Sequence, residues 1–324
     1  LGHANPQSGE EQAQKCDPAV QILRRPALDE GLIRHIQNHD QRAEIPGHRR
    51  CADSAASLKL PPPLPPARNI TFVAPEQWRR DWAAGSNLFA PLRWLAQHTD
   101  QPDWPNQADY HRLAALPPAQ VVQPLSFVLP ENLPQDGQYY ETRIHRSGCV
   151  PTRHANWHDF FNAAVWLTFP LSKQALNRRH IAGMAASGPG GRGPLRDAAT
   201  LFDESGIALP CCDPQLVDCL RQHRWQELFV TRRSAWGKTI DACVFGHAIY
   251  EKALAPYLGF TAKAWPIAVD AGFFTLDAAA QLRTLDRILA AELDQPQQLA
   301  HPRTLLPLPV LGVPGWWPDN EHPD

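Results

Sequence analysis

The segment Arg153-His154-Ala155-Asn156-Trp157-His158-Asp159-Phe160-Phe161-Asn162 opens the clearest helical pattern in the chain. Apolar or small side chains recur on one face at helical spacing, at Trp157, Phe160, Phe161, Ala164, Val165 and Thr168. This spacing predicts a helix over 156–169 with one buried face. Asn156 suits the N-cap, and Asp159 stands where a capping-box acid belongs. Pro170 is expected to end the helix.

The same segment carries polar side chains that capping does not explain. His158 and Asn162 are four residues apart, so they share a helix face that is not the face of Trp157. His154 precedes the helix start. A cluster of histidine, asparagine and carboxylate there can bind a divalent metal or a phosphate. The alternative is that His158 only forms a hydrogen bond to a neighbouring loop.

The rest of the pattern predicts an α+β fold, a helix-dominated single domain over 69–324 with a small β-hairpin or sheet. Further helices are expected at 171–181, 214–236, 241–255 and 275–294. A hairpin is expected over 200–209, with its turn near Ser205 and Gly206. The glycine-rich segment 183–194 is expected to be a flexible loop, and the proline-rich tail 307–317 to lie extended.

Residues 1–68 differ from the remainder of the chain. They are polar, poor in aromatic residues and end in the proline-rich run 60–66. The chain has 33 prolines, about twice the average share, and many of them lie in its first third. We therefore expect 1–68 to be a poorly ordered extension of the domain.

Composition argues against several classes of protein. A net charge of -2 over 324 residues gives no general attraction to nucleic acid. No apolar run approaches the ~20 residues that cross a bilayer, and the first residues lack a secretory pattern. The seven cysteines form no C-x-x-C pair, so neither a usual zinc site nor a disulfide framework is expected. These features predict a cytoplasmic protein.

Several motifs occur in a recognisable order, and they lie at 156–162, 165–170, 192–198, 201–204, 245–248 and 307–316. In these motifs the chain resembles a bacterial family named domain of unknown function 3025, over roughly residues 70–318. The chain ends soon after the last motif, as expected of a truncated end. The family name implies no reaction, so no catalytic residue is carried over. The chemistry has to be argued from the side chains.

His247 and Glu251 form a second candidate pair. They are four residues apart, so on a helix they point toward one place, as two metal ligands or a base and its orienting acid would. The alternative is an ion pair on a solvated helix face. A second histidine-bearing helix in the same domain as that of His158 favours a single site that uses both histidines.

Further charged candidates surround the glycine-rich segment. Arg196 and Asp197 follow it, while Asp203 and Glu204 stand at the end of the expected strand, where carboxylates commonly hold Mg²⁺ or Mn²⁺. Local turn formation is the alternative explanation for Asp203 and Glu204. The P-loop and dinucleotide-binding patterns are absent from the segment.

The first hypothesis is a divalent-metal-dependent hydrolase that prefers a phosphoester or another small anionic substrate. The metal, open between Mg²⁺, Mn²⁺ and Zn²⁺, would activate water. The expected metal ligands are His158, Asp197, His247 and Glu251. The expected catalytic residues are His158, Asp203 and Arg196, with Arg196 stabilising the anionic transition state.

The second hypothesis is a non-catalytic binding or interaction protein. The same polar residues would then form a structural network around the two histidine-bearing helices. An exposed tail at Trp316 and Trp317 would suit a partner contact. The distance between His158 and His247 discriminates the two hypotheses, because a shared site requires the side chains to meet.

Overall fold

The computed structural model describes residues 72, 74–116, 124–187 and 193–321, all of which belong to one compact unit, Pro66–Asp324. The expected extension at 1–68 lies outside the described residues. The α-helices are α1 Arg93–Ala96, α2 Gln107–Ala114, α3 Tyr140–Ser147, α4 Trp157–Thr168, α5 Pro170–Ser187, α6 Pro194–Ser205, α7 Pro214–Arg221, α8 His247–Ala253 and α9 Ala278–Leu293. The strands are β1 Ser126–Val128, β2 Cys149–Pro151, β3 Gly206–Cys211, β4 Cys243–Val244, β5 Thr261–Ala268 and β6 Leu306–Pro309. The unit is a helix-dominated α+β fold, as predicted.

The larger sheet has the strand order β4-β3-β5-β6. Its centre is the parallel pair of β3 and β5, in which Ile207 is paired with Ala264, and every residue of β3 is buried. Strand β6 pairs with β5 in antiparallel orientation and forms one edge. The expected extended tail 307–317 is confirmed only as far as Pro309, because Val310–Gly312 forms a 3-10 helix and turns follow it. A separate small sheet pairs β1 with β2.

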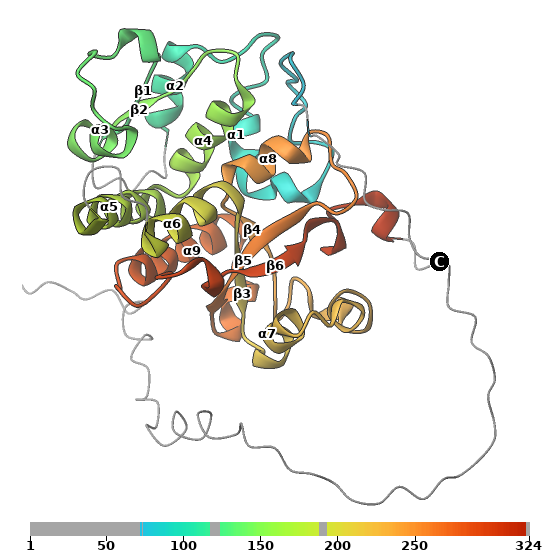
Figure 1. Cartoon of the computed structure of the whole chain (residues 1–324). Helices are drawn as coiled ribbons and strands as arrows, with labels where there is room; N and C mark the ends of the chain where they lie inside the picture. Colours follow the sequence, from blue (N-terminus) through green and yellow to red (C-terminus); the bar gives the residue numbers. More distant parts are fainter. Residues whose placement is uncertain (1–71, 73, 117–123, 188–192, 322–324) are drawn as a thin grey trace, which may run out of the picture. The chain divides into compact units, whose positions relative to one another are not determined.

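Helices pack around this sheet (Figure 1). Helix α5 packs against α3, α6 and α9, and α6 packs on β3 and β5. Helix α4 packs against α8 through a buried aromatic cluster in which Phe161 stacks on Tyr250. The α4–α8 contact matters for function because it brings together segments about ninety residues apart, as with His158 and His247.

The start of α4 confirms one part of the capping prediction and corrects another. Asn156 is the N-cap, and its side chain accepts a hydrogen bond from the Asp159 backbone at 3.0 Å. Asp159 does not complete a capping box. Its carboxylate instead accepts hydrogen bonds from the backbone and the guanidinium of Arg153, because a bidentate arginine pair is the stronger option for an acid at this position. Pro170 begins α5 directly after α4 ends, as predicted.

The hairpin expected over 200–209 is wrong. Helix α6 continues to Ser205, and β3 begins at Gly206. The helix prevails because Ala198, Ala199 and Phe202 lie at helical spacing and are all buried. Gly206 is required at the junction, since a Cβ there would lie 2.3 Å from the Phe202 carbonyl oxygen. Asp203 and Glu204 therefore belong to the last turn of a helix and not to a strand end.

Other boundaries also differ from expectation. Helix α5 extends to Ser187, so part of the expected loop 183–194 is helical, while 188–192 lie outside the described residues. The expected helix 214–236 ends at Arg221 and is followed by a short π-helix, Glu227–Thr231. Trp316 is 6% exposed, which contradicts the expected exposed pair in the tail. Within the described segments, no helix has the length and apolar character that crossing a bilayer requires.

Candidate functional site

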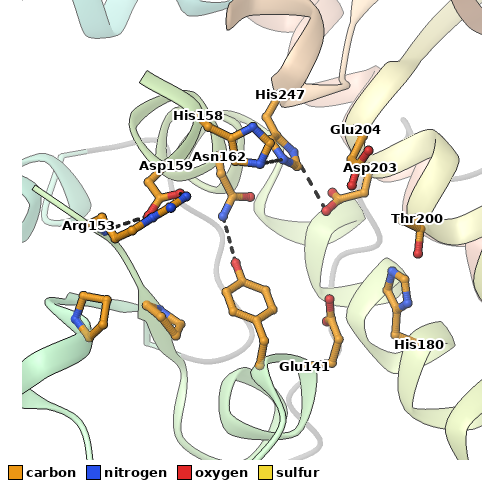
Figure 2. A pocket seen from close by; sticks show the side chains of 13 residues that line it. Glu141, Arg153, His158, Asp159, Asn162, His180, Thr200, Asp203, Glu204 and His247 are labelled. Carbon is orange, nitrogen blue, oxygen red and sulfur yellow. Dashed lines mark hydrogen bonds and ion pairs between the residues drawn. The ribbon is translucent and has the colours of Figure 1, made fainter. Parts of the chain in front are cut away.

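A cavity of about 370 Å³ opens between α3, α4, α5, α6 and α8. Its lining residues are Pro130, Tyr140, Glu141, Pro151, Arg153, His158, Asp159, Asn162, His180, Thr200, Asp203, Glu204 and His247. Figure 2 shows the side chains of His158 and His247 close together, with Asn162 and Asp203 beside them. The cavity thus collects titratable groups from helices that are distant in sequence.

His158 and His247 meet, as the shared-site hypothesis requires. The Nε2 atoms of the two rings are 3.0 Å apart. The other nitrogen of His158, Nδ1, lies 3.0 Å from Oε2 of Glu251, and 36% of the His158 side chain is exposed. The hydrogen bond to Glu251 raises the pKa of His158 and outweighs the opposing effect of partial burial. His158 is therefore an oriented imidazole that titrates above its ordinary range.

His247 has the opposite electrostatic character. The residue is 5% exposed, and burial lowers its pKa to about 3. Its Nδ1 atom is buried without a hydrogen-bond partner in the described part of the chain and lies 3.9 Å from Oδ2 of Asp203. His247 thus stays neutral at ordinary pH, while its neighbour His158 carries protons more readily.

Behind His247, a buried polar chain continues into the protein. Lys173 is 3% exposed and donates hydrogen bonds to Asp203 and to Oδ1 of Asn162, the latter at 3.0 Å. The Asn162 amide in turn donates to the Tyr140 hydroxyl at 2.8 Å. Burial alone would raise the pKa of Asp203, but the charge of Lys173 and the hydrogen bond that it donates lower it. Asp203 therefore remains an anion inside the protein.

Glu141 is another carboxyl group that lines the same cavity (Figure 2). Burial raises the pKa of this carboxyl above its usual value. Its Oε2 atom accepts a hydrogen bond from Nδ2 of Asn177 at 2.5 Å. The cavity consequently contains one carboxyl biased toward protonation, Glu141, and one biased toward ionisation, Asp203.

Arg153 and Asp159 form an ordered pair at the edge of the cavity. Two guanidinium nitrogens of Arg153 lie 2.9 Å from the two oxygens of Asp159. The Arg153 side chain is 59% exposed, whereas that of Asp159 is 13% exposed. The bidentate geometry fixes the segment before α4. It also means that the Arg153 guanidinium is already paired with the Asp159 carboxylate.

The remaining predicted residues do not all reach the site. Glu204 lines the cavity, whereas Arg196 and Asp197 are not among its lining residues. Asp197 is exposed on the first turn of α6, and Arg196 packs so closely on α5 that a Cβ at Gly183 would lie 2.5 Å from its Cγ. In the described ranges, no group of three or more histidine, cysteine, aspartate or glutamate residues could hold a metal ion. Of the four predicted metal ligands, the structure brings His158, His247 and Glu251 together but not Asp197.

Sequence reasoning missed Tyr140, Glu141 and Lys173. Lys173 offered one signal, because Asn177 and His180 follow it at i+4 and i+7 and so share its face of the predicted helix 171–181. Its partner Asp203 lies thirty residues away, on an element that was predicted as a strand. Tyr140 and Glu141 carried no comparable signal.

The fold and the cavity define a class: a helix-rich α+β protein with a histidine and carboxylate site between its helices. The chain belongs to the family described as Protein of unknown function (DUF3025), whose model matches residues 125–324. The matched range includes every residue that lines the cavity. No curated protein and no solved structure matches the chain.

Proposed function

We propose that this protein is a hydrolase in which His158 activates a water molecule. The observation that carries the proposal is the hydrogen-bonded series Glu251, His158 and His247, in which the two histidines line the cavity and Glu251 lies behind His158. A histidine held by a carboxylate is the usual form of a general base, because the acid fixes the ring and stabilises its protonated state.

The proton from water would be taken up at Nε2 of His158. This atom is hydrogen-bonded to Nε2 of His247, so a water molecule has to replace His247 as the hydrogen-bond partner of His158. Hydrogen bonds at such sites commonly rearrange when substrate binds. His247 is suited to this exchange, since its lowered pKa keeps it neutral and it does not compete for the proton. Its role is to position His158 and the water.

The Tyr140 hydroxyl would stabilise negative charge on the reacting carbonyl. It accepts a hydrogen bond from Asn162 and still has its own proton to donate. Burial raises the pKa of Tyr140, so the hydroxyl remains protonated. Lys173 donates a hydrogen bond to the side-chain amide oxygen of Asn162. This bond polarises the amide group that donates to the Tyr140 hydroxyl. A preorganised donor of this kind stabilises a developing oxyanion.

The cavity favours a substrate without net negative charge, which changes the predicted preference for a phosphoester. Its described lining includes the carboxyl groups Glu141, Asp159, Asp203 and Glu204. Arg196 does not line it, and the guanidinium of Arg153 is paired with Asp159. We therefore propose a neutral ester or amide as the substrate class.

The test is hydrolysis of three probes: p-nitrophenyl acetate, p-nitroacetanilide and bis(p-nitrophenyl) phosphate. The proposal predicts enzymatic release of nitrophenol or nitroaniline from the first two. Preferential hydrolysis of the phosphate would restore the phosphoester prediction. Inactivity on all three would contradict the proposal and favour the non-catalytic alternative, in which the polar network is only structural.

A divalent metal is a second candidate component of this hydrolase. Two imidazole nitrogens bound at about 2.0–2.1 Å to one ion lie roughly 3 Å apart, and the Nε2 atoms of His158 and His247 have that spacing of 3.0 Å. Each ring also has a carboxylate behind it, Glu251 or Asp203, as metal-bound histidines commonly do. Two converging histidines are fewer ligands than a catalytic metal site usually has, so we propose the metal-dependent hydrolase second to metal-free catalysis.

Prolonged treatment with EDTA distinguishes the two versions. We expect the treated protein to hydrolyse p-nitrophenyl acetate at its original rate, because His158 acts as the base without a metal. Untreated protein carried through the same dialysis is the control. A loss of activity that Zn²⁺ or Mn²⁺ restores would establish the metal-dependent version instead.

The pH dependence should report the interaction between Glu251 and His158. The base form of His158 is required, so activity should rise as pH increases through its raised pKa. Glu251→Gln removes the charge that stabilises the imidazolium, so this rise should move to lower pH. The measurement is kcat/KM for p-nitrophenyl acetate from about pH 5 to 9. The exposed variant Glu76→Gln serves as the control, and an unshifted profile in Glu251→Gln would refute the pairing.

A further inference from the structure

A second cavity, of about 340 Å³, lies beside the larger sheet and away from the histidines. Pro210, near the carboxyl end of β3, and Phe273, in the segment that follows β5, both line it. Helix α9 contributes Leu282 and Leu285 to the wall. The carboxyl ends of parallel strands are a frequent place for ligands in sheets of this kind. The volume also falls within the range of small-molecule sites.

Asp241 is the only aspartate, glutamate, lysine or arginine among the described residues that line this cavity. Its Oδ1 atom accepts a hydrogen bond from the Ala242 backbone at 2.7 Å. Within the described ranges, no lysine, arginine or histidine forms an ion pair with it. Burial raises its pKa. A partly buried carboxylate without a cation raises the free energy of the folded protein, and a positively charged ligand would offset this by pairing with it.

The rest of the cavity is suited to the apolar body of such a ligand. Trp236, Phe273 and Trp316 line it together with proline and leucine side chains. Aromatic faces attract ammonium groups through their quadrupole, most strongly in tryptophan. A single acid among aromatic walls is thus complementary to one positive charge attached to a hydrocarbon or ring.

We propose that this second cavity binds a small organic ammonium ion, with the charged nitrogen at Asp241 and the apolar part between Trp236, Phe273 and Trp316. This site is independent of the proposed hydrolase activity. It shares no lining residue with the histidine cavity. Failure of one proposal therefore leaves the other in place.

Benzylammonium and benzyl alcohol test this site by isothermal titration calorimetry on the full chain. The two probes have nearly the same shape and differ in charge. We expect benzylammonium to bind at least tenfold more tightly than benzyl alcohol, and Asp241→Asn to remove most of that preference. Asparagine keeps the acceptor for the Ala242 backbone, so the fold should be retained.

Asp218→Asn, which alters an exposed acid on α7, is the matched control and should bind like the original protein. Quenching of tryptophan fluorescence by benzylammonium provides a second readout through Trp236 and Trp316. Equal binding of the two probes, unchanged preference in Asp241→Asn or absence of binding by benzylammonium would each overturn the proposal.

Discussion

Replacement of His158 by glutamine is expected to lower kcat/KM for p-nitrophenyl acetate by about 10²–10⁴-fold, the range for loss of a general base. Glutamine can still form hydrogen bonds to Glu251 and His247 but cannot accept the proton of water at ordinary pH. The effect should appear mainly in kcat, because His158 acts on water and not on substrate binding. Stopped-flow or steady-state release of nitrophenol measures it.

The matched control for this prediction is His111→Gln, which changes an exposed histidine on α2. Its activity should equal that of the original protein. Thermal unfolding of both variants shows whether the fold is intact. Activity that survives in a folded His158→Gln variant would show that His158 is not the base.

Replacement of Lys173 by methionine is expected to lower the free energy of unfolding by about 3–5 kcal/mol, as when one partner of a buried ion pair is removed. Methionine nearly matches the length of the lysine stem but leaves the carboxylate of Asp203 buried without its cation. It also removes the donor to Asn162. Urea unfolding followed by circular dichroism measures the change.

Two comparisons isolate the cause of this loss. Lys238→Met, at an exposed lysine, should change stability by less than about 0.5 kcal/mol. Adding Asp203→Asn to Lys173→Met should recover part of the loss, because no buried charge remains. The lowered pKa of Asp203 means that the pair stabilises the protein above the unfolded pKa and ceases to do so as pH falls through the folded pKa. The difference between Lys173→Met and the original protein should therefore shrink in acid, and a constant difference would contradict the mechanism.

Helical spacing and capping were sufficient to predict the part of the site that lies on α4. The apolar spacing from Trp157 onward and the cap at Asn156 depend on neighbours within a few residues, so both the helix and the face of His158 could be predicted. The separation of His247 and Glu251 is likewise a local property of a helix. Their convergence on His158 was a hypothesis that only the packing of α4 on α8 could decide.

Tertiary packing explains what local rules missed. The segment from Thr200 contains residues that suit a strand, but burial of Phe202 against Phe245 and Trp265 favours the helix. This change places Asp203 on a helix facing Lys173. Lys173 and Asp203 are thirty residues apart and lie on different helices, so no helical spacing relates them and their pairing could not be predicted from the sequence pattern.

The edge strand β6 also limits how the protein associates with itself. The Val310 backbone donates to Phe260, so by strand alternation Leu308 points its N–H toward β5 while Pro307 and Pro309 face the open edge. Proline has no N–H, and another strand laid along this edge would find those donors missing. The two prolines therefore disfavour edge-to-edge pairing of this sheet with another strand. Alanine at both positions would restore the missing N–H donors.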